Sequence, residues 1–207
     1  MDVMNFIQKA AVAVLLAVTV AASPAFANDA AEQFVQKVLD EAQPYLELED
    51  EQAQLDGIAT LVDKYVDMRH IGYFVLGKYA RQITSEQKEE YFPLFEDYAR
   101  SIYQEALTRY SGERLAVTGS VDRSEKNIFV QSKVANAKPG DEYADTLIEW
   151  WVHVNNDGEM RIVDAGADGI FLSIEQQETF TSIIADNGGP PAGIDALIEN
   201  IREKVDD

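Results

Sequence analysis

Hydrophobic positions along the chain change their period twice, from helical spacing to a two-residue alternation and back again. Helical spacing runs over residues 30–64, with an interruption at Pro44, and a shorter helical piece covers residues 67–78. A long helix is then predicted from Ser85, its expected N-cap, to about Tyr110. The first half of the chain is therefore predicted to be helical.

Four segments with alternating hydrophobic residues follow the long helix. They cover residues 115–121, 128–134, 143–154 and 160–167. Their links are short, and Asn155–Gly158 has the composition of a hairpin turn, so the strands should form an antiparallel meander. Helical spacing returns after Gly169. This order predicts an α+β fold, a four-stranded antiparallel meander with helices packed on one face.

The first 27 residues have the pattern of a secretory signal peptide. Lys9 precedes an apolar run over residues 10–22, and Ala25-Phe26-Ala27 provides the small residues that signal peptidase requires. The alternative is an uncleaved anchor, but this run is shorter than the roughly 20 residues that span a bilayer. We therefore expect residues 1–27 to be removed, residues 28–207 to form a single domain without a permanent membrane anchor, and the protein to reach a bacterial periplasm.

Composition excludes several classes of function. Acidic residues outnumber basic ones 37 to 17, so the formal net charge is -20 and a nucleic-acid partner is not expected. The chain has no cysteine, which removes disulfides, thiol nucleophiles and cysteine-ligated metals. Hydrophobic residues make up 46% of the chain, which is enough for a substantial core.

Few residues form a pattern that points to chemistry. The two histidines, His70 and His153, could meet at a metal ion only if carboxylates completed the site, so no metal is expected. Asp164 and Asp168-Gly169 stand in an apolar setting, where a carboxylate could act as a general base. The interpretation we favour is structural: Asp164 binds backbone amides at a strand end, and Asp168-Gly169 makes the next turn.

Apolar side chains are the most conspicuous feature. Trp150 and Trp151 are neighbours on one strand, so they must face opposite sides of the sheet. The long helix carries a wide aromatic stripe. Composition alone allows either a filled core or an apolar cavity between helix and sheet.

Several motifs resemble the MlaC family, also called toluene-tolerance auxiliary proteins. The segment LGKYARQITSEQ at residues 76–87 is similar to the family signature LGRYWRxxSPEQ. Further similarities follow in the family's order over about residues 60–205. They are Phe92-Pro93-Leu94-Phe95, Tyr103, Ala106-Leu107, Val163-Asp164, Asp168-Gly169-Ile170, Phe180 and residues 193–198. The chain departs from the family pattern at Ala80, Phe171 and Gln176-Gln177, where tryptophan, serine and tyrosine-arginine are usual.

The resemblance implies a periplasmic phospholipid-binding shuttle rather than an enzyme. Its fold would be nuclear-transport-factor-two-like, with an apolar cavity between sheet and helices that receives acyl chains. Its partners would be an outer-membrane lipoprotein–porin complex and an inner-membrane ABC transporter complex. We expect a monomer with no cofactor, and phospholipid as the cargo.

Eleven residues are predicted to line that cavity, because the helical members share a face and the strand members alternate in register. They are Phe74, Leu76, Tyr79, Phe95, Tyr98, Ile102, Trp150, Val152, Ile162, Ile170 and Phe171. Two alternatives stay open. One is an isomerase or dehydratase that uses Asp164 with Tyr79 or Tyr103, and the other is a protein-interaction domain with a filled core.

Overall fold

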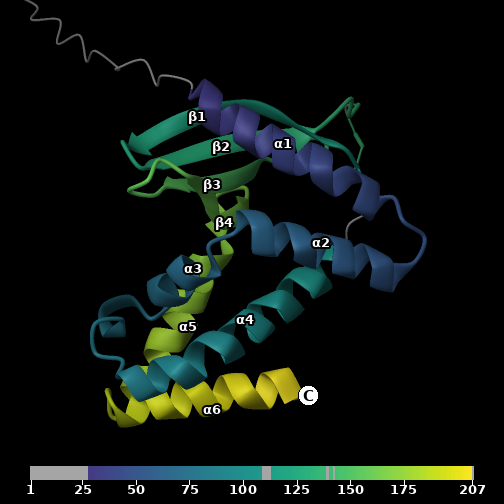
Figure 1. The fold of residues 1–207 in the computed structure, drawn as a ribbon. Coiled ribbons are helices and arrows are strands. Elements are labelled where there is room, and N and C mark those ends of the chain that lie inside the picture. The colour runs from purple at the N-terminus through teal and green to yellow at the C-terminus, as the bar shows by residue number, and fades with distance from the viewer. Residues whose placement is uncertain (1–27, 109–112, 139, 142, 207) are drawn as a thin grey trace, which may run out of the picture.

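A computed structural model describes residues 28–108, 113–138, 140–141 and 143–206 (Figure 1). The predicted signal peptide, residues 1–27, lies outside the described residues. The helices are α1 (Asp29–Leu46), α2 (Glu51–Tyr65), α3 (Met68–Val75), the 3-10 helix η1 (Gly77–Tyr79), α4 (Ser85–Thr108), α5 (Leu172–Asp186) and α6 (Ala192–Asp206). The strands are β1 (Leu115–Ser124), β2 (Asn127–Val134), β3 (Ile148–Val154), β4 (Met160–Ala167) and β5 (Ile170–Phe171).

The strands form one antiparallel sheet in the order β1-β2-β3-β4-β5, which confirms the predicted α+β class and meander. The prediction missed β5, a two-residue strand that pairs with the end of β4. It also began the third strand too early, because residues 143–145 form turns instead. In these turns the amide of Ala144 donates to the carbonyl of Asp141 at 3.2 Å, and that of Thr146 donates to the carbonyl of Tyr143 at 3.1 Å.

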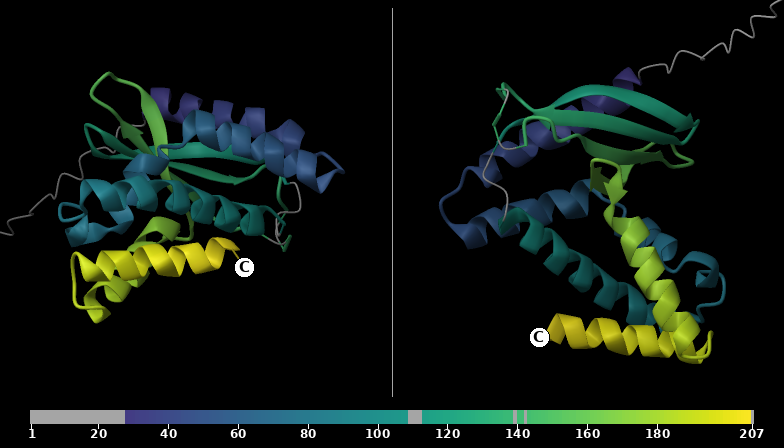
Figure 2. Two further views of the ribbon diagram at one scale, coloured as in Figure 1. Left: turned by 60° about the horizontal axis from the view of Figure 1, so that its bottom comes forward. Right: turned by 180° about the vertical axis from the view of Figure 1, so that it is seen from behind.

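The helices divide into two groups, which is a more complex arrangement than packing on one face. The helix α1 crosses β1 and β2, and α2 runs back beside it (Figures 1 and 2). The helices α3 to α6 form a second layer at the end where β4 leaves the sheet (Figure 1). There the ring of Phe74 on α3 meets Trp151, with ring centroids 5.6 Å apart. The second layer therefore reaches the sheet face opposite Trp150.

Side-chain caps fix where the helices begin. Asn28 accepts from the amide of Ala31 at 3.1 Å at the start of α1. The cap of α4 is Thr84 rather than the predicted Ser85. Its hydroxyl accepts from the amide of Gln87, and the side chain of Gln87 accepts from the amide of Thr84, both at 3.1 Å. This reciprocal capping box satisfies both amides.

The second layer holds the largest cluster of buried residues, which we call the helical core. Tyr91 is fully buried there, and its hydroxyl donates to the carbonyl of Gly72 at 2.9 Å. Its ring stacks on Phe95 with centroids 5.6 Å apart. The buried members are Ile71, Val75, Leu76, Tyr79, Ile83, Tyr91, Phe92, Phe95, Tyr98, Ala99, Val163, Phe180, Ile184, Ile194, Leu197, Ile198 and Ile201. Within the described residues, no helix is both long enough and apolar enough to span a membrane.

Candidate functional site

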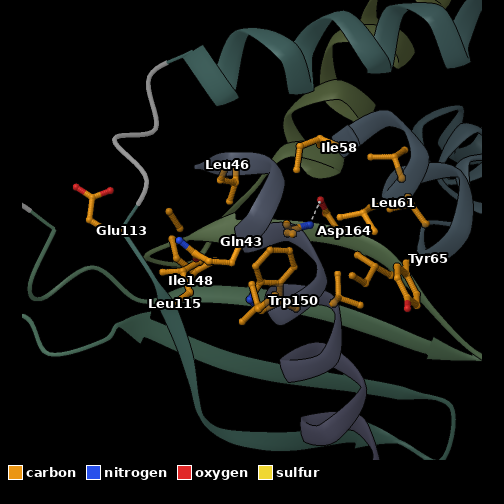
Figure 3. A pocket seen from close by; sticks show the side chains of 18 of the residues that line it. Gln43, Leu46, Ile58, Leu61, Tyr65, Glu113, Leu115, Ile148, Trp150 and Asp164 are labelled. Carbon is orange, nitrogen blue, oxygen red and sulfur yellow. Dashed lines mark hydrogen bonds between the residues drawn. The ribbon is translucent and has the colours of Figure 1, made fainter. Parts of the chain in front are cut away.

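A cavity of about 540 Å³ lies between the α1–α2 pair and the inner face of the sheet (Figure 3). This volume falls in the range typical of small-molecule sites. The helices and Val66, the residue that follows α2, contribute one side of the lining: Val38, Leu39, Ala42, Gln43, Leu46, Ile58, Leu61, Val62, Tyr65 and Val66. The sheet and its adjoining segments contribute Glu113, Leu115, Val134, Tyr143, Thr146, Ile148, Trp150, Ile162, Asp164, Ala165, Ala167 and Leu172.

The α2 wall follows directly from helical spacing. Ile58, Leu61, Val62 and Tyr65 stand at positions i, i+3, i+4 and i+7, so they share the face that looks toward the sheet. Their helical spacing can be read from the sequence, but none of them is among the eleven residues predicted to line the cavity. The sequence feature that could have identified them is the pair of amphipathic helices that precedes the strands in the chain.

Hydrogen bonds hold α1 over the sheet. The hydroxyl of Ser120 on β1 donates to Glu32 Oε1 at 2.7 Å and accepts from the amide of Asn28 at 2.7 Å. One helical turn further along, the amide of Val117 donates to Gln36 Oε1 at 3.0 Å. Beyond these contacts α1 continues over the sheet, and its second half forms one wall of the cavity.

The strand wall presents alternate residues of β3 and their neighbours. Ile148 and Trp150 face the cavity (Figure 3). Ile162 on β4, which also lines the cavity, belongs to the buried cluster against which Trp150 packs. Trp150 Nε1 donates to the hydroxyl of Ser132 on β2 at 2.9 Å. This bond satisfies the indole N–H, so the ring can present an apolar surface to a ligand.

Polar side chains are few along the walls. Among the described residues that line the cavity they are Gln43, Glu113, Thr146 and Asp164, together with the tyrosines Tyr65 and Tyr143, and no lysine, arginine or histidine is among them. A surface of this kind favours hydrocarbon, because burying an unpaired polar group in it would cost free energy.

Asp164 is 2% exposed, and hydrogen bonds occupy its carboxylate. Oδ1 accepts from the amides of Ala165 at 2.8 Å and Ser173 at 3.4 Å, while Oδ2 accepts from the hydroxyl of Ser173. Burial raises the pKa of Asp164, and these hydrogen bonds counteract part of that effect. Because Ser173 lies in the first turn of α5, Asp164 joins β4 to the start of that helix, as the structural interpretation predicts.

Asp168 and Gly169 form the turn between β4 and β5. Both residues have positive φ, 51° and 83° respectively. The carboxylate of Asp168 accepts from the amide of Leu147 at 3.0 Å. These two residues therefore shape the chain at this corner, and neither lines the cavity.

The structure brings only two of the eleven predicted residues, Trp150 and Ile162, to the cavity wall. Val152 is fully buried against Ala31 and Val35, where α1 touches the sheet. Ile170 is 60% exposed, and Phe171 packs on Phe129. The remaining six belong to the helical core or pack against it: Phe74, Leu76, Tyr79, Phe95, Tyr98 and Ile102.

Most of the predicted residues miss the cavity because the aromatic stripe of α4 packs against another helix and not against the sheet. Phe95 and Tyr98 meet Phe180 of α5 at centroid distances of 6.3 and 5.9 Å, so α5 covers them instead of the inner sheet face. Tyr79, one partner proposed for Asp164 in an enzyme, also lies in this core. The side chain of the other, Tyr103, lies outside the described residues.

The two histidines meet, with ring centroids 4.7 Å apart. Burial and the neighbouring His70 lower the pKa of His153. Its Nδ1 lies 3.1 Å from the side-chain oxygen of Asn127. Among the described residues no group of three or more histidine or acidic side chains is placed to hold a metal ion.

The departures from the family pattern lie where α5 joins the other helices. The hydroxyl of Tyr98 donates to Gln176 Oε1 at 3.0 Å, and Gln177 Nε2 donates to the carbonyl of Phe74 at 2.6 Å. Ala80 packs against the helical core. These residues therefore stabilise the second layer rather than the cavity.

Comparison with known proteins places this fold and cavity in context. Residues 31–203 match the family described as MlaC protein. The chain belongs to the MlaC family. A curated MlaC relative from Haemophilus influenzae, the "intermembrane phospholipid transport system binding protein MlaC", is 26% identical over 142 residues. That match covers 68% of this chain and 63% of the relative's length.

A solved structure of a phospholipid-binding protein has the same fold. It is the phospholipid-binding protein from Ralstonia solanacearum, determined in complex with a phospholipid. The TM-score is 0.68 at 20% identity, and the match covers 85% of this chain and 97% of the other. At this identity the likeness establishes the fold.

Proposed function

We propose that the protein carries phospholipid through the periplasm between transport complexes of the two membranes. The observation that supports this most strongly is the apolar cavity under α1 and α2. Transfer of an acyl chain into water costs about 0.8 kcal/mol for each methylene, so a carrier needs an apolar enclosure of this kind. The Haemophilus relative is named for intermembrane phospholipid transport, and the Ralstonia structure holds a phospholipid.

Phospholipid binding can be tested on the mature protein purified without detergent. Extraction with organic solvent followed by mass spectrometry should recover phospholipid in proportion to protein. Ile58→Glu places a carboxylate in the cavity wall and should abolish recovery, because acyl chains cannot solvate it. Ile183→Glu is the matched control, since Ile183 is equally half-buried on a helix but packs against the helical core. Equal retention by both variants would contradict a binding site in this cavity.

Transport is a further step, and it needs its own experiment. Donor vesicles containing a fluorescent phospholipid are mixed with unlabelled acceptor vesicles, with and without the protein. A carrier should accelerate transfer in proportion to its concentration, and Ile58→Glu should not. Retention of lipid without accelerated transfer would contradict the carrier function while leaving phospholipid binding intact.

Export and partners complete the proposal. We propose that signal peptidase removes residues 1–27 and that the released chain docks on an outer-membrane lipoprotein–porin complex and an inner-membrane ABC transporter complex. The intact mass of protein from a periplasmic extract should correspond to a chain that begins at Asn28. A mass that includes residues 1–27 would refute the export step.

A further inference from the structure

Two cations lie against one aromatic ring where α3 meets α4. Cζ of Arg69 is 5.7 Å from the centroid of the Tyr73 ring, and Nζ of Lys88 is 5.9 Å from it. Arg69 also lies 4.7 Å from the centroid of Phe92, whose ring packs edge to face on Tyr73. We call Arg69, Tyr73, Lys88 and Phe92 the basic-aromatic cluster.

The two cations of this cluster have no counter-ion in the described part of the chain. Four arginines do have one, among them Arg100, which pairs with Asp63 at 3.3 Å, and Arg202, which pairs with Glu90 at 3.0 Å. Arg81 and Arg123 form no ion pair with the described residues either. Neither Arg69 nor Lys88 takes part in such a pair with the described residues. Residues 68–85 contain Arg69, Lys78 and Arg81 and no acidic side chain, although the chain carries a net charge of -20. Lys88 follows this segment and has Glu86 and Glu89 near it in the sequence.

Helix ends add to this positive charge. Arg69 stands in the first turn of α3, and Lys88 in the first turn of α4. A helix N-terminus carries partial positive charge, so acidic residues normally stabilise this position and basic ones do not. Asp67 caps α3 by accepting from the amide of His70 at 2.8 Å, and it forms no ion pair with either cation. The cluster therefore combines two cations with two helix N-termini, although the first turn of α4 also contains the acidic Glu86.

We propose that the basic-aromatic cluster is a docking site for an acidic segment of a partner protein. A carboxylate of that segment would lie between Arg69, which is exposed, and Lys88, and its aliphatic part would cover the half-buried ring of Tyr73. An acidic segment places negative charge only at the cluster. An anionic membrane would also be repelled by the excess of carboxylates on this protein, which carries a net charge of -20, so it suits the site less well.

This proposal is independent of phospholipid binding, because no residue of the cluster lines the cavity. A titration of the mature protein with a glutamate hexapeptide, followed by amide and side-chain NMR shifts, tests it directly. We expect saturable shifts centred on Arg69, Tyr73 and Lys88 that weaken as salt is added. The double variant Arg69→Gln/Lys88→Gln should bind the peptide roughly tenfold more weakly. Lys133→Gln, which removes an exposed cation of β2, should bind as the unmodified chain does.

Thermal unfolding checks that the variants fold. If the double variant does not fold, the single variant Arg69→Gln takes its place, because Arg69 is exposed. Three outcomes would overturn the proposal. The first is the absence of saturable shifts at the cluster. The second is an equal response to inorganic phosphate, which would make the cluster a small-anion site. The third is co-flotation with phosphatidylglycerol vesicles that the double variant loses, which would assign the cluster to the membrane.

Discussion

Trp150 and Ser132 join β3 to β2 through a 2.9 Å hydrogen bond from the indole N–H to a hydroxyl that is completely buried. The bond fixes the orientation of the indole ring at the cavity wall. Ser132 would be left unsatisfied without it, and Trp150 therefore has two separable roles: its N–H stabilises the sheet, and its ring forms part of the cavity surface.

The first prediction separates these roles. Trp150→Phe should lower the free energy of unfolding by about 1 kcal/mol through the lost hydrogen bond, and it should retain lipid. Trp150→Ala should lower the free energy of unfolding by less than the roughly 3–5 kcal/mol that truncation of a core aromatic residue costs, because the ring of Trp150 already borders a cavity. This variant should also retain less lipid. Trp150→Glu should retain none.

Phe95→Ala is the control for this series, since Phe95 is 2% exposed within the helical core and should show the full truncation cost. Denaturant unfolding and the lipid-to-protein ratio measure the two effects. A Trp150→Ala variant as unstable as Phe95→Ala would mean that the ring is ordinary core.

Trp150 also shows how far the sequence could predict the site. Two-residue alternation assigns its face correctly, because strand geometry is local. The aromatic stripe of α4 was equally clear, yet Phe95 meets α5 rather than the inner sheet face. Periodicity reveals that a helix has an apolar face, but the element that covers this face depends on tertiary packing. For the same reason Ile58 and Leu61 on α2 could be assigned to a helical face but not to a cavity.

A second prediction concerns Asp164 and pH. Because its pKa is raised in the folded protein, folded chains bind a proton at higher pH than unfolded chains do. Protonation of Asp164 therefore stabilises the fold, and this contribution is lost as pH rises through the raised pKa. Asp164→Asn cannot titrate. The stability of the unmodified protein relative to this variant should fall as pH rises from the ordinary aspartate range through that pKa.

Urea unfolding of both proteins at matched pH values measures this difference, and the comparison cancels the titration of the other carboxylates. Ser173→Ala removes the hydroxyl that donates to Asp164, a bond that lowers the pKa, so it should move the transition to higher pH. A pH-independent difference between the unmodified protein and Asp164→Asn would show that Asp164 has the same pKa in both states.

The third prediction concerns the close approach of α1 and α2. Gly57 is buried, and a Cβ built there would collide with the ring of Tyr45. Gly57→Ala should therefore destabilise the protein by about 1–3 kcal/mol, although alanine is the better helix former. Tyr45→Ala should relieve the collision, so the double variant should be more stable than additivity of the two single changes allows. Additive thermal shifts would show that the helices can separate at no cost.

The last prediction uses two alanines that differ in what surrounds them. Ala42 lines the cavity from α1, whereas Ala99 is 7% exposed within the helical core on α4. Adding a large side chain to a packed core forces neighbours out of their rotamers and costs about 1–3 kcal/mol. Ala99→Phe should show that cost and keep its lipid. Ala42→Phe should unfold at nearly the same denaturant concentration as the unmodified chain, because the new ring enters the open space of the cavity. Because the ring then occupies that space, this variant should retain much less lipid. Both variants carry the same substitution on a helix, so propensity effects cancel in the comparison. If Ala42→Phe is destabilised as strongly as Ala99→Phe, the space beside α1 is not open in solution, and the lipid must bind elsewhere.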